Sequence, residues 1–374
     1  FMDIFGLRSD VLEKGSDETA LANALDKVQD PNAFLDRIAF LYANPDERAR
    51  DEVAMVDGRV LDRYSAPVVS KDGHRYGRIW FFRDVTDERR YQRELMVART
   101  EAEAAREEAS RYAKSLRKEL ETGRRIQRGF LPAKLPQPAG YETDVRFKPA
   151  WQVAGDFYDM FYAAPGLLGI VVADVCGKGV GAALFMALFQ SLLRTSAERA
   201  GSAPHQSSNP EAAIVIESMT STNDYIKRVH QPSHIFASVF FGLLNEKTGD
   251  VTYVNAGHEP PWLVDACGVS RLRPTGPAVG MLSGVTFGVQ RVQMLPGALL
   301  LAYTDGVTEA RNAAGDFFGE QRLRALLANS AAGSSAQVLE RVEQTVTEFS
   351  DSSPPSDDVT MLAVRRLPVP EPAA

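Results

Sequence analysis

The chain has 374 residues, of which 44% are hydrophobic and 24% charged, and its formal net charge is −7 at pH 7. This composition predicts a soluble globular protein of about two domains, and the acidic balance argues against non-specific nucleic-acid binding through a basic face. The two cysteines, Cys176 and Cys267, exclude a disulfide framework and a zinc cluster, and favour a reducing, cytoplasmic compartment. No apolar run approaches the roughly 18 residues of a membrane span. The chain begins at Phe1 and shows no signal-peptide pattern. A start without Met suggests a piece of a longer polypeptide.

The first 86 residues predict a small α+β region. Helix-like stretches at Glu18–Val28 and Asn32–Ala43 are followed by strand-like stretches at Asp51–Val56, Val60–Val69 and Arg75–Arg83. Asp-Gly pairs separate these strands, and such pairs are a strong hairpin signal. The last strand runs into a charged segment through the string FRDVTDERR. This string resembles the exit of a PAS sensor domain into a signalling helix, and the opening FMDIFGL resembles a stretch after that family's first strands. The resemblance implies an N-terminally truncated PAS-like sensor domain over residues 1–86.

The next segment predicts one long helix. Of the 42 residues Asp87–Arg128, 21 are Asp, Glu, Lys or Arg, and none is Pro. Weakly apolar residues recur in steps of four and three, at Tyr91, Leu95, Ala98, Ala102, Ala105, Ala109, Tyr112 and Leu116. This spacing is a heptad seam, and the step from Leu116 to Leu120 breaks it with a stutter that locally unwinds a supercoil. A single solvated helix is the alternative, but the seam favours a parallel dimeric coiled coil over residues 87–130, ending before Pro132.

Residues 131–367 predict sheet layers covered by helices. The strand-like stretches are Tyr141–Phe147, Asp156–Phe161, Leu167–Asp174, Ile235–Leu244, Val251–Asn255, Val285–Met294, Ala298–Tyr303 and Val359–Arg365. The helical stretches are Val180–Ala197, Pro210–Arg228, Gln321–Leu327 and Ala336–Phe349. The Pro-rich tail, residues 368–374, is predicted to be disordered.

Acidic residues lie at predicted strand ends in four strings: GDFYD (155–159), ADVCGKG (173–179), YTDGVTEA (303–310) and SDDVT (356–360). A carboxylate at the end of a buried strand is costly to leave unpaired, so it needs a cation or several N–H donors. Any one of these acids could instead cap a turn, because Asp before Gly is common in turns. Four such acids at strand ends favour a shared ligand.

Carboxylates without a His or Cys cluster favour a hard cation, Mg²⁺ or Mn²⁺. Four of them exceed what one Mg²⁺ normally takes from a protein, which indicates a pair of ions. Two ions about 3.5–4 Å apart clamp a phosphate and activate a water molecule, so the pattern predicts phosphate-ester hydrolysis without a covalent enzyme intermediate. Strand alternation puts Asp156 and Asp159 on opposite faces, and we expect Asp156 in the site and Asp159 in a supporting or structural position.

Six strings in order, over roughly 240 residues, resemble the bacterial SpoIIE/RsbU-like branch of the metal-dependent protein phosphatases (the PPM family). They are RRIQRGFLP, VAGDFYD, ADVCGKGVGAALFMA, NAGHEPPWL, YTDGVTEARN and SDDVTMLAV. The resemblance implies an α/β (α+β) fold, the α-β-β-α sandwich of that family, with two Mn²⁺ or Mg²⁺ ions between the sheets. Three residues depart from the family pattern. Ala154 stands where the family usually has Gly, Gly181 where it often has Pro, and Cys176 where it often has Ser.

The same resemblance implies a role for each acid. Asp174 bridges both ions and Val175 lends its backbone carbonyl, whereas Asp156 completes the first ion site. Asp305 holds the second ion together with one of the adjacent pair Asp357 and Asp358, of which Asp357 matches better. Asp156, Asp174 and Asp305 are thus the expected catalytic residues.

Three further side chains near these strings carry weaker expectations. His258, in the NAGHEP turn, is expected as a hydrogen-bonded structural histidine rather than a general acid. Lys178 could orient phosphate or face solvent. Cys176 has no histidine near it in sequence, which argues against a nucleophilic thiol.

The chain is therefore expected to be a sensor-regulated, cytoplasmic serine/threonine phosphoprotein phosphatase that dimerises through its coiled coil. By resemblance, the substrate is a phosphorylated STAS-type anti-sigma-factor antagonist. One rival is a catalytically inactive dimeric scaffold that holds a phosphoprotein. A nucleotidyl cyclase is the other, and the absence of a GGDEF-like string or a phosphate-cradling loop argues against it.

Overall fold

The computed structural model of the chain describes residues 2–5, 21–22, 24–204, 209–329, 333–351 and 355–368. The chain divides into two compact units, Phe1–Lys114 and Ser115–Ala374. The predicted disordered tail lies outside the described residues apart from Pro368, and the predicted helix Glu18–Val28 lies partly outside them.

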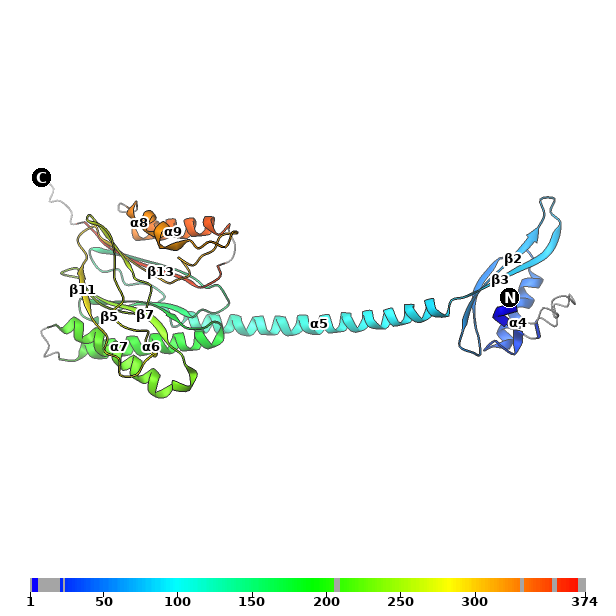
Figure 1. The fold of residues 1–374 in the computed structure, drawn as a ribbon, viewed down its shortest axis with the longest axis horizontal. Helices are drawn as coiled ribbons and strands as arrows, with labels where there is room; N and C mark the ends of the chain where they lie inside the picture. Colours follow the sequence, from blue (N-terminus) through cyan, green and yellow to red (C-terminus); the bar gives the residue numbers. More distant parts are fainter. Residues whose placement is uncertain are drawn as a thin grey trace. The chain divides into compact units, whose positions relative to one another are not determined.

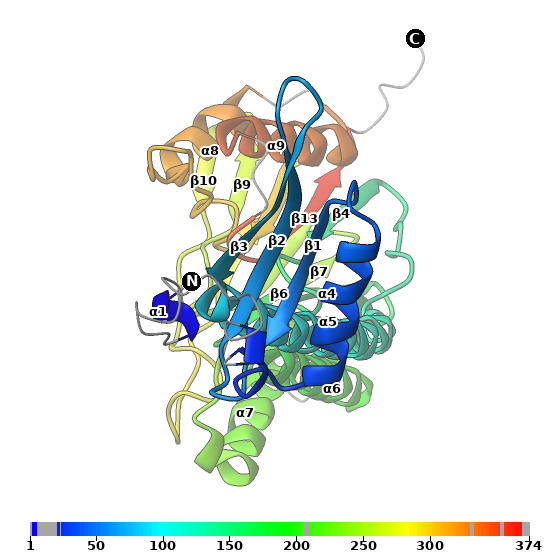
Figure 2. The same ribbon diagram turned by 90° about the vertical axis from the view of Figure 1, so that its right-hand side faces the viewer.

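The first unit is a three-stranded antiparallel sheet with a helix on one face. The helices are α1 (Met2–Phe5) and α4 (Pro31–Ala43), and the strands are β1 (Ala49–Ala54), β2 (Val60–Val69) and β3 (Arg75–Asp84), in the order β1-β2-β3. Helix α4 runs beside the strands (Figure 2). Asp30 caps its first turn by accepting a hydrogen bond from the Ala33 N–H. Phe5, Phe34, Met55 and Leu61 belong to the small core of this unit. The three predicted strands and the helix at 32–43 are confirmed, while the PAS assignment stays a prediction.

Helix α5 (Thr86–Arg128) is a continuous helix of 43 residues. Its first turn holds Asp87 and Glu88 and its last turn holds Arg125 and Arg128, which suits the helix dipole at both ends. It ends before Pro132, as predicted. The side chains of the predicted seam are exposed along this helix, for example Leu95 and Tyr112 at 71% each. The coiled coil that would bury them stays a prediction.

The second unit is a sandwich of two five-stranded sheets. One sheet has the order β11-β8-β7-β6-β5 and the other the order β10-β9-β12-β13-β4. The first contains β5 (Asp156–Ala164), β6 (Leu167–Val175), β7 (Ala237–Asn245), β8 (Asp250–Ala256) and β11 (Gln290–Gln293). The second contains β4 (Tyr141–Lys148), β9 (Trp262–Asp265), β10 (Gly268–Arg271), β12 (Leu299–Tyr303) and β13 (Val359–Arg366).

Helices cover the outer faces of both sheets. Helices α6 (Val180–Ser202) and α7 (Pro210–Val229) lie on one side, and α8 (Gly319–Ala328) and α9 (Ser335–Phe349) lie on the other (Figure 1). A short 3-10 turn, η1 (Gln231–Ser233), follows α7. This is the predicted α-β-β-α arrangement.

Strand alternation separates two cores in this unit. On β12, Leu300 and Ala302 join the core between the sheets, whereas Leu299 and Leu301 pack under α8 and α9. On β13, even-numbered residues likewise face the space between the sheets. Residues Thr304 and Thr360 continue this even-numbered face at the strand ends, so their hydroxyls point between the sheets.

One strand prediction for this unit needs correction, and one hairpin was not predicted. The stretch Val285–Met294 is predicted to be one strand, but only β11 pairs with the edge strand β8. The preceding residues instead leave the sheet, because Phe287 is buried in the core and the Gly288 N–H donates to the Thr275 carbonyl. The hairpin of β9 and β10, four residues each, has too short a pattern to stand out in the sequence.

Among the described helices, α6 is long and apolar enough to cross a membrane by length and composition alone. Met186, Phe189 and Leu193 of this helix are buried in the core of the second unit. The same criteria are met by core helices of globular proteins, and burial of this face accounts for the apolar sequence here.

Candidate active site

Four strand ends from the two sheets bring the predicted acids together. Asp156, the first residue of β5, lies directly opposite Asp174, near the end of β6, in the antiparallel register. Asp305 follows the end of β12 by two residues, and Asp357 and Asp358 immediately precede β13. The charges of these last three acids all act on Asp174, so acids more than a hundred residues apart in sequence share one electrostatic environment.

Asp156 is fixed by two hydroxyl groups from the opposite sheet. Its side chain is only 2% exposed, and its Oδ2 accepts hydrogen bonds from Thr304 Oγ1 at 2.7 Å and Thr360 Oγ1 at 2.6 Å. Neither hydroxyl carries charge, so the carboxylate is oriented without being neutralised. These bonds also join the two sheets at the site.

The two neighbouring acids before β13 have different surroundings. Asp358 is buried, and its two carboxylate oxygens accept hydrogen bonds from the Ala150 and Gly155 N–H groups, both at 2.8 Å. Asp357 is half-buried, and its Oδ2 accepts a hydrogen bond from Lys178 Nζ at 2.7 Å. Asp358 therefore ties the loop before β5 to β13, whereas Asp357 has an exchangeable partner at the surface of the site.

Crowding of the acids raises their pKa values. Burial, and next the charge of Asp174, hold the pKa of Asp156 well above its usual range. Burial and then the charges of Asp305 and Asp357 raise the pKa of Asp174 to about 7, and burial followed by Asp357 raises the pKa of Asp305 to about 6. Like charges at directly opposed strand positions repel, so without a cation these carboxyl groups hold their protons more tightly than ordinary aspartates do.

The chemistry of the donor set fits a hard divalent cation. The converging side chains are all carboxylates, which are the ligands that Mg²⁺ and Mn²⁺ prefer. Within the described residues, no three Asp, Glu, His or Cys side chains are already arranged as a metal-binding group. Lys178 Nζ donates to Asp357 Oδ2 at 2.7 Å, so this carboxylate would have to release the ammonium group to bind a cation.

We expect Asp174 and Asp305 to destabilise the metal-free chain as pH rises from about 4 to about 7. With pKa values of about 7 and about 6, both bind protons more tightly in the folded chain than in the unfolded chain, where an aspartate has a pKa of about 3.9. The folded state then holds more protons in this window, and its stability falls with increasing pH.

Thermal unfolding in EDTA at pH 5 and pH 7.5 measures this effect. His258, whose pKa burial lowers to about 4, acts in the opposite direction over this window, so the comparison is made against Asp174→Asn. The Tm of the wild type, relative to that of the variant, should be lower at pH 7.5 than at pH 5 by about 3 °C or more. An equal difference at both pH values would contradict the expectation.

Asp159 lies on the other face of β5, as strand alternation predicts. It is buried, accepts a hydrogen bond from Gln190 Nε2 at 2.6 Å, and pairs with Arg194 at 3.2 Å. Both partners belong to α6. Asp159 therefore fastens β5 to α6 and faces away from the other acids.

Val175 ends β6 beside a close backbone approach. A Cβ added to Gly155 would lie 3.0 Å from the Val175 carbonyl oxygen and 3.5 Å from Asp174 Oδ1. Glycine at position 155 therefore lets the loop before β5 come close to the end of β6. The Val175 carbonyl and the Asp174 carboxylate lie on the same side of this approach.

The weaker candidates have structural contacts. His258 is buried, its Nδ1 lies 2.8 Å from Ser238 Oγ, and burial lowers its pKa to about 4, so it is neutral at physiological pH. Ser238 is the β7 neighbour of Asp174, which places His258 behind the acids as a support. The Cys176 sulfur accepts a hydrogen bond from the Phe236 N–H at 3.3 Å.

Sequence reasoning missed three polar residues of the site. Thr304 and Thr360 lie inside quoted strings, but the carboxylate they bind is 148 and 204 residues away. Gln127, the buried residue of α5, donates to the Ala154 carbonyl at 2.6 Å and accepts from the Ala154 N–H at 3.1 Å. Gln127 lies among arginines in the string RRIQRGFLP, and no local pattern distinguishes it from the other uncharged polar residues of α5.

The chain is similar to known proteins. Residues 164–367 match the family model described as Stage II sporulation protein E (SpoIIE). The chain is 41% identical over 266 residues to Protein IcfG of Synechocystis sp., a match that covers 67% of the chain and 42% of that relative. It is 24% identical over 253 residues to Phosphoserine phosphatase RsbU of Bacillus subtilis, covering 67% of the chain and 71% of the relative.

Among solved structures, the SiaA-PP2C domain of Pseudomonas aeruginosa has the same fold. The TM-score is 0.57 at 23% identity, and the match covers 67% of the chain and 97% of that domain. RsbU is named a phosphoserine phosphatase, the structural neighbour is named a PP2C domain, and the family model spans more than half of the chain. The chain belongs to the SpoIIE family of PP2C-type protein phosphatases.

Proposed function

We propose that the chain is a metal-dependent phosphatase that removes phosphate from phosphoserine or phosphothreonine on a signalling protein. The observation that carries the proposal is the convergence of Asp156, Asp174, Asp305 and Asp357 at strand ends of both sheets, where burial and mutual repulsion raise the pKa of Asp174 to about 7. Such a group of carboxylates is unfavourable for stability on its own, and its use is to hold divalent cations against a phosphate.

The acids would divide between two sites for Mn²⁺ or Mg²⁺. Asp174, which is opposite Asp156 in the strand register and interacts with the charges of Asp305 and Asp357, would be a ligand of both ions, and the Val175 carbonyl would be a further ligand. Asp357 is the better ligand of the adjacent pair, because both oxygens of Asp358 already accept backbone hydrogen bonds. When bound, the ions would lower the pKa of a water molecule and stabilise charge on the phosphate.

Other residues of the chain would position these groups. The Thr304 and Thr360 hydroxyls hold Asp156 in one orientation without removing its charge. Lys178 lies at the surface of the site, where its ammonium group, once released from Asp357, would attract and orient a phosphate dianion. A neutral, buried His258 would act through Ser238 as a support rather than as an acid.

The substrate, regulation and location are further parts of the proposal. The relative RsbU is named a phosphoserine phosphatase, and the resemblance of the motifs supports a STAS-type anti-sigma-factor antagonist as substrate. The chain would form a homodimer through α5, and the PAS-like unit would act as the sensor. The protein would be located in the cytoplasm. The match spans less than half of Protein IcfG, so the activity and partners of the whole protein also belong to the proposal. A scaffold without activity is less favoured, because every acidic position is present.

Phosphate release from a phosphoserine protein, with Mn²⁺ and with EDTA, tests the function. Asp305→Asn in Mn²⁺ tests the site, and the exposed Asp316→Asn is a matched control beyond the acids. Release that requires the metal and is lost only in Asp305→Asn would support the proposal. Full release in EDTA would contradict it, and a chain that neither releases phosphate nor binds Mn²⁺ would be a scaffold.

Gln127→Ala tests the link between α5 and the site. The substitution leaves the buried Ala154 N–H and carbonyl without their partner, next to Gly155, whose N–H binds Asp358. We expect a loss of about 1–3 kcal/mol in stability and at least a several-fold loss of phosphate release. Ile126→Ala, an exposed neighbour on α5, is the control and should change neither.

Regulation through α5 has its own test. If a chain lacking residues 1–120 were as active as the intact chain and no differently regulated, a signalling role for the PAS-like unit and the helix would be wrong. An unchanged Tm and activity in Gln127→Ala would contradict the link at its catalytic end.

A further inference from the structure

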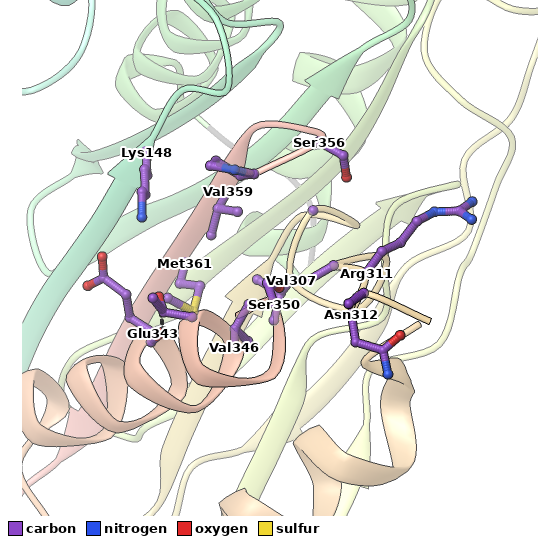
Figure 3. Close-up of a pocket in the computed structure, with 15 residues that line it drawn as sticks. Lys148, Val307, Arg311, Asn312, Glu343, Val346, Ser350, Ser356, Val359 and Met361 are labelled. Carbon is purple, nitrogen blue, oxygen red and sulfur yellow. Dashed lines mark hydrogen bonds between the residues drawn. The ribbon is translucent and has the colours of Figure 1, made fainter. Parts of the chain in front are cut away.

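A cavity lies on the outer face of the sheet that contains β4 and β13, next to the loops that carry Asp305 and Asp357. It has a volume of about 250 Å³ and lies between β13 and the C-terminal half of α9 (Figure 3). Val307, Val346, Val359 and Met361 give it an apolar floor. Odd-numbered residues of β13 face this side, so the cavity is separate from the space between the sheets where Asp156 lies.

The size and charge of the cavity limit its occupant. Small-molecule sites typically have volumes of about 300–1,000 Å³. This cavity is smaller than that range, and its size suits a single amino-acid side chain. Lys148 from β4 and Glu343 from α9 point toward one another at one side of it (Figure 3). Arg311 extends away from it, with its guanidinium carbon 4.2 Å from the Phe317 ring centroid. These charges favour no net charge in the occupant, and the floor favours an apolar one.

The wall of the cavity is continuous with the loops that carry Asp305 and Asp357. Gly306, in the wall, directly follows Asp305, and Ser356 directly precedes Asp357. An extended polypeptide advances about 3.3 Å per residue, so residues within a few positions of a phosphorylated residue at the acids would reach the cavity. A phosphatase acting on a protein must have such neighbouring residues at its surface.

We propose that this cavity binds an apolar side chain of the substrate protein, a few residues from the phosphorylated residue. The inference rests on the proposed phosphatase function and names the chemistry by which the substrate segment is recognised. The occupant is one Leu-sized side chain, because the cavity is small, has an apolar floor and opens beside the loops of Asp305 and Asp357. Burial of such a side chain supplies roughly ten-fold or more in binding.

The experiment compares phosphoserine peptides with the intact chain in Mg²⁺. In each peptide, one position from three residues before to three residues after the phosphoserine is Leu, and the others are Gly. An aryl phosphate without any peptide serves as the reference substrate. We expect Leu at one position or more to raise kcat/KM about ten-fold or more over the all-Gly peptide.

Two substitutions fill the cavity and one is a matched control. Thr347→Trp on α9 and Ala313→Trp in the loop after Asp305 both place an indole at lining positions. Gln344→Trp adds the same side chain at an exposed position of α9 that does not line the cavity. The ratio of kcat/KM for the Leu peptide to kcat/KM for the all-Gly peptide should fall to about two or less in the two filled variants and should stay as in the wild type in the control. Hydrolysis of the aryl phosphate should be unchanged in all three variants.

Binding is also read without turnover. Met361 is one of nine methionines, so its methyl signal, assigned with Met361→Leu, can be followed by NMR in Mg²⁺. The ligand is the non-hydrolysable phosphonate analogue of the preferred Leu peptide; if no peptide is hydrolysed, the analogue of each Leu peptide is used in turn. A Leu analogue should shift the Met361 signal, and the all-Gly analogue should not.

The outcomes separate the subsite from the catalytic function. Aryl phosphate hydrolysis with no Leu preference at any position overturns the subsite alone, as does a preference that persists in both filled variants. A shift of the Met361 signal with free leucine amide as large as that with the peptide would instead make the cavity a site for small ligands. Failure to hydrolyse any substrate, with no Met361 shift, overturns both proposals.

Discussion

Replacing Asp174 by asparagine is expected to lower metal-dependent phosphate release by at least about a thousand-fold. Asp174 stands directly across from Asp156 and feels the charges of Asp305, Asp357 and Asp358, so it is the acid shared by both halves of the site. An amide has the shape of a carboxylate but no negative charge, and it bridges two cations poorly. Phosphate release from a phosphoserine protein, measured over a range of Mn²⁺ concentrations, checks the loss.

The same substitution should stabilise the metal-free chain at pH 7.5. The amide in Asp174→Asn removes one of two opposed charges that are buried without a cation, so the Tm in EDTA should rise by a few degrees while the Tm increase caused by Mn²⁺ shrinks. Asp316→Asn, at an exposed position, should leave both quantities and the activity unchanged. A variant that is less stable in EDTA and less active would indicate a merely structural aspartate. Opposite signs for activity and stability are characteristic of a site whose charges serve a ligand.

The layered fold could be predicted because its strands and helices are long and strongly patterned. β2 and β4 lie where alternation and turn residues placed them, and α6 and α7 are close to their predicted limits. The short pair β9 and β10 escaped prediction because four residues carry little periodicity. β11 was predicted too long because the apolar residues before it, such as Phe287, are buried as a loop rather than as a strand.

The candidate site could be predicted as a set of acids but not as a geometry. A carboxylate next to glycine after an apolar run is visible in the sequence, which is how Asp174 and Asp305 were found. The register that opposes Asp156 to Asp174 depends on the turn between β5 and β6, and no local pattern states it. Hydroxyl partners such as Thr304 and Thr360 are common residues whose role depends entirely on distant contacts.

The difference between Asp357 and Asp358 is the clearest example of what sequence leaves open. Two identical adjacent residues have the same chemistry, and only the folded backbone distinguishes them. Asp358 meets two N–H groups from the loop before β5, whereas Asp357 meets Lys178. Burial by non-local backbone therefore separates a structural carboxylate from an exchangeable one.

Gly306→Ala is expected to be the most damaging single-atom change near the acids. A Cβ at this position would lie 2.0 Å from the Asp358 carbonyl oxygen and 2.9 Å from its carbonyl carbon, so backbone must move. The turn after β12 would then separate from the start of β13, and with it Asp305 from Asp357. We expect a loss of about 2–4 kcal/mol in stability.

Activity should fall further than stability alone explains, because the displaced Asp305 is one of the proposed metal ligands. A shift of about 1 Å in a positioned group can cost about a hundred-fold in rate. Phosphate release from the folded fraction, measured well below the Tm of the variant, should therefore drop by about that factor, and the Tm increase caused by Mn²⁺ should become smaller. Gly181→Ala is the matched control, since a Cβ there meets nothing within 4 Å and the residue lies in the first turn of α6. Equal stability and activity in both alanine variants would mean that the loops of Asp305 and Asp358 do not depend on their close approach, and the geometry argued for the site would then be wrong.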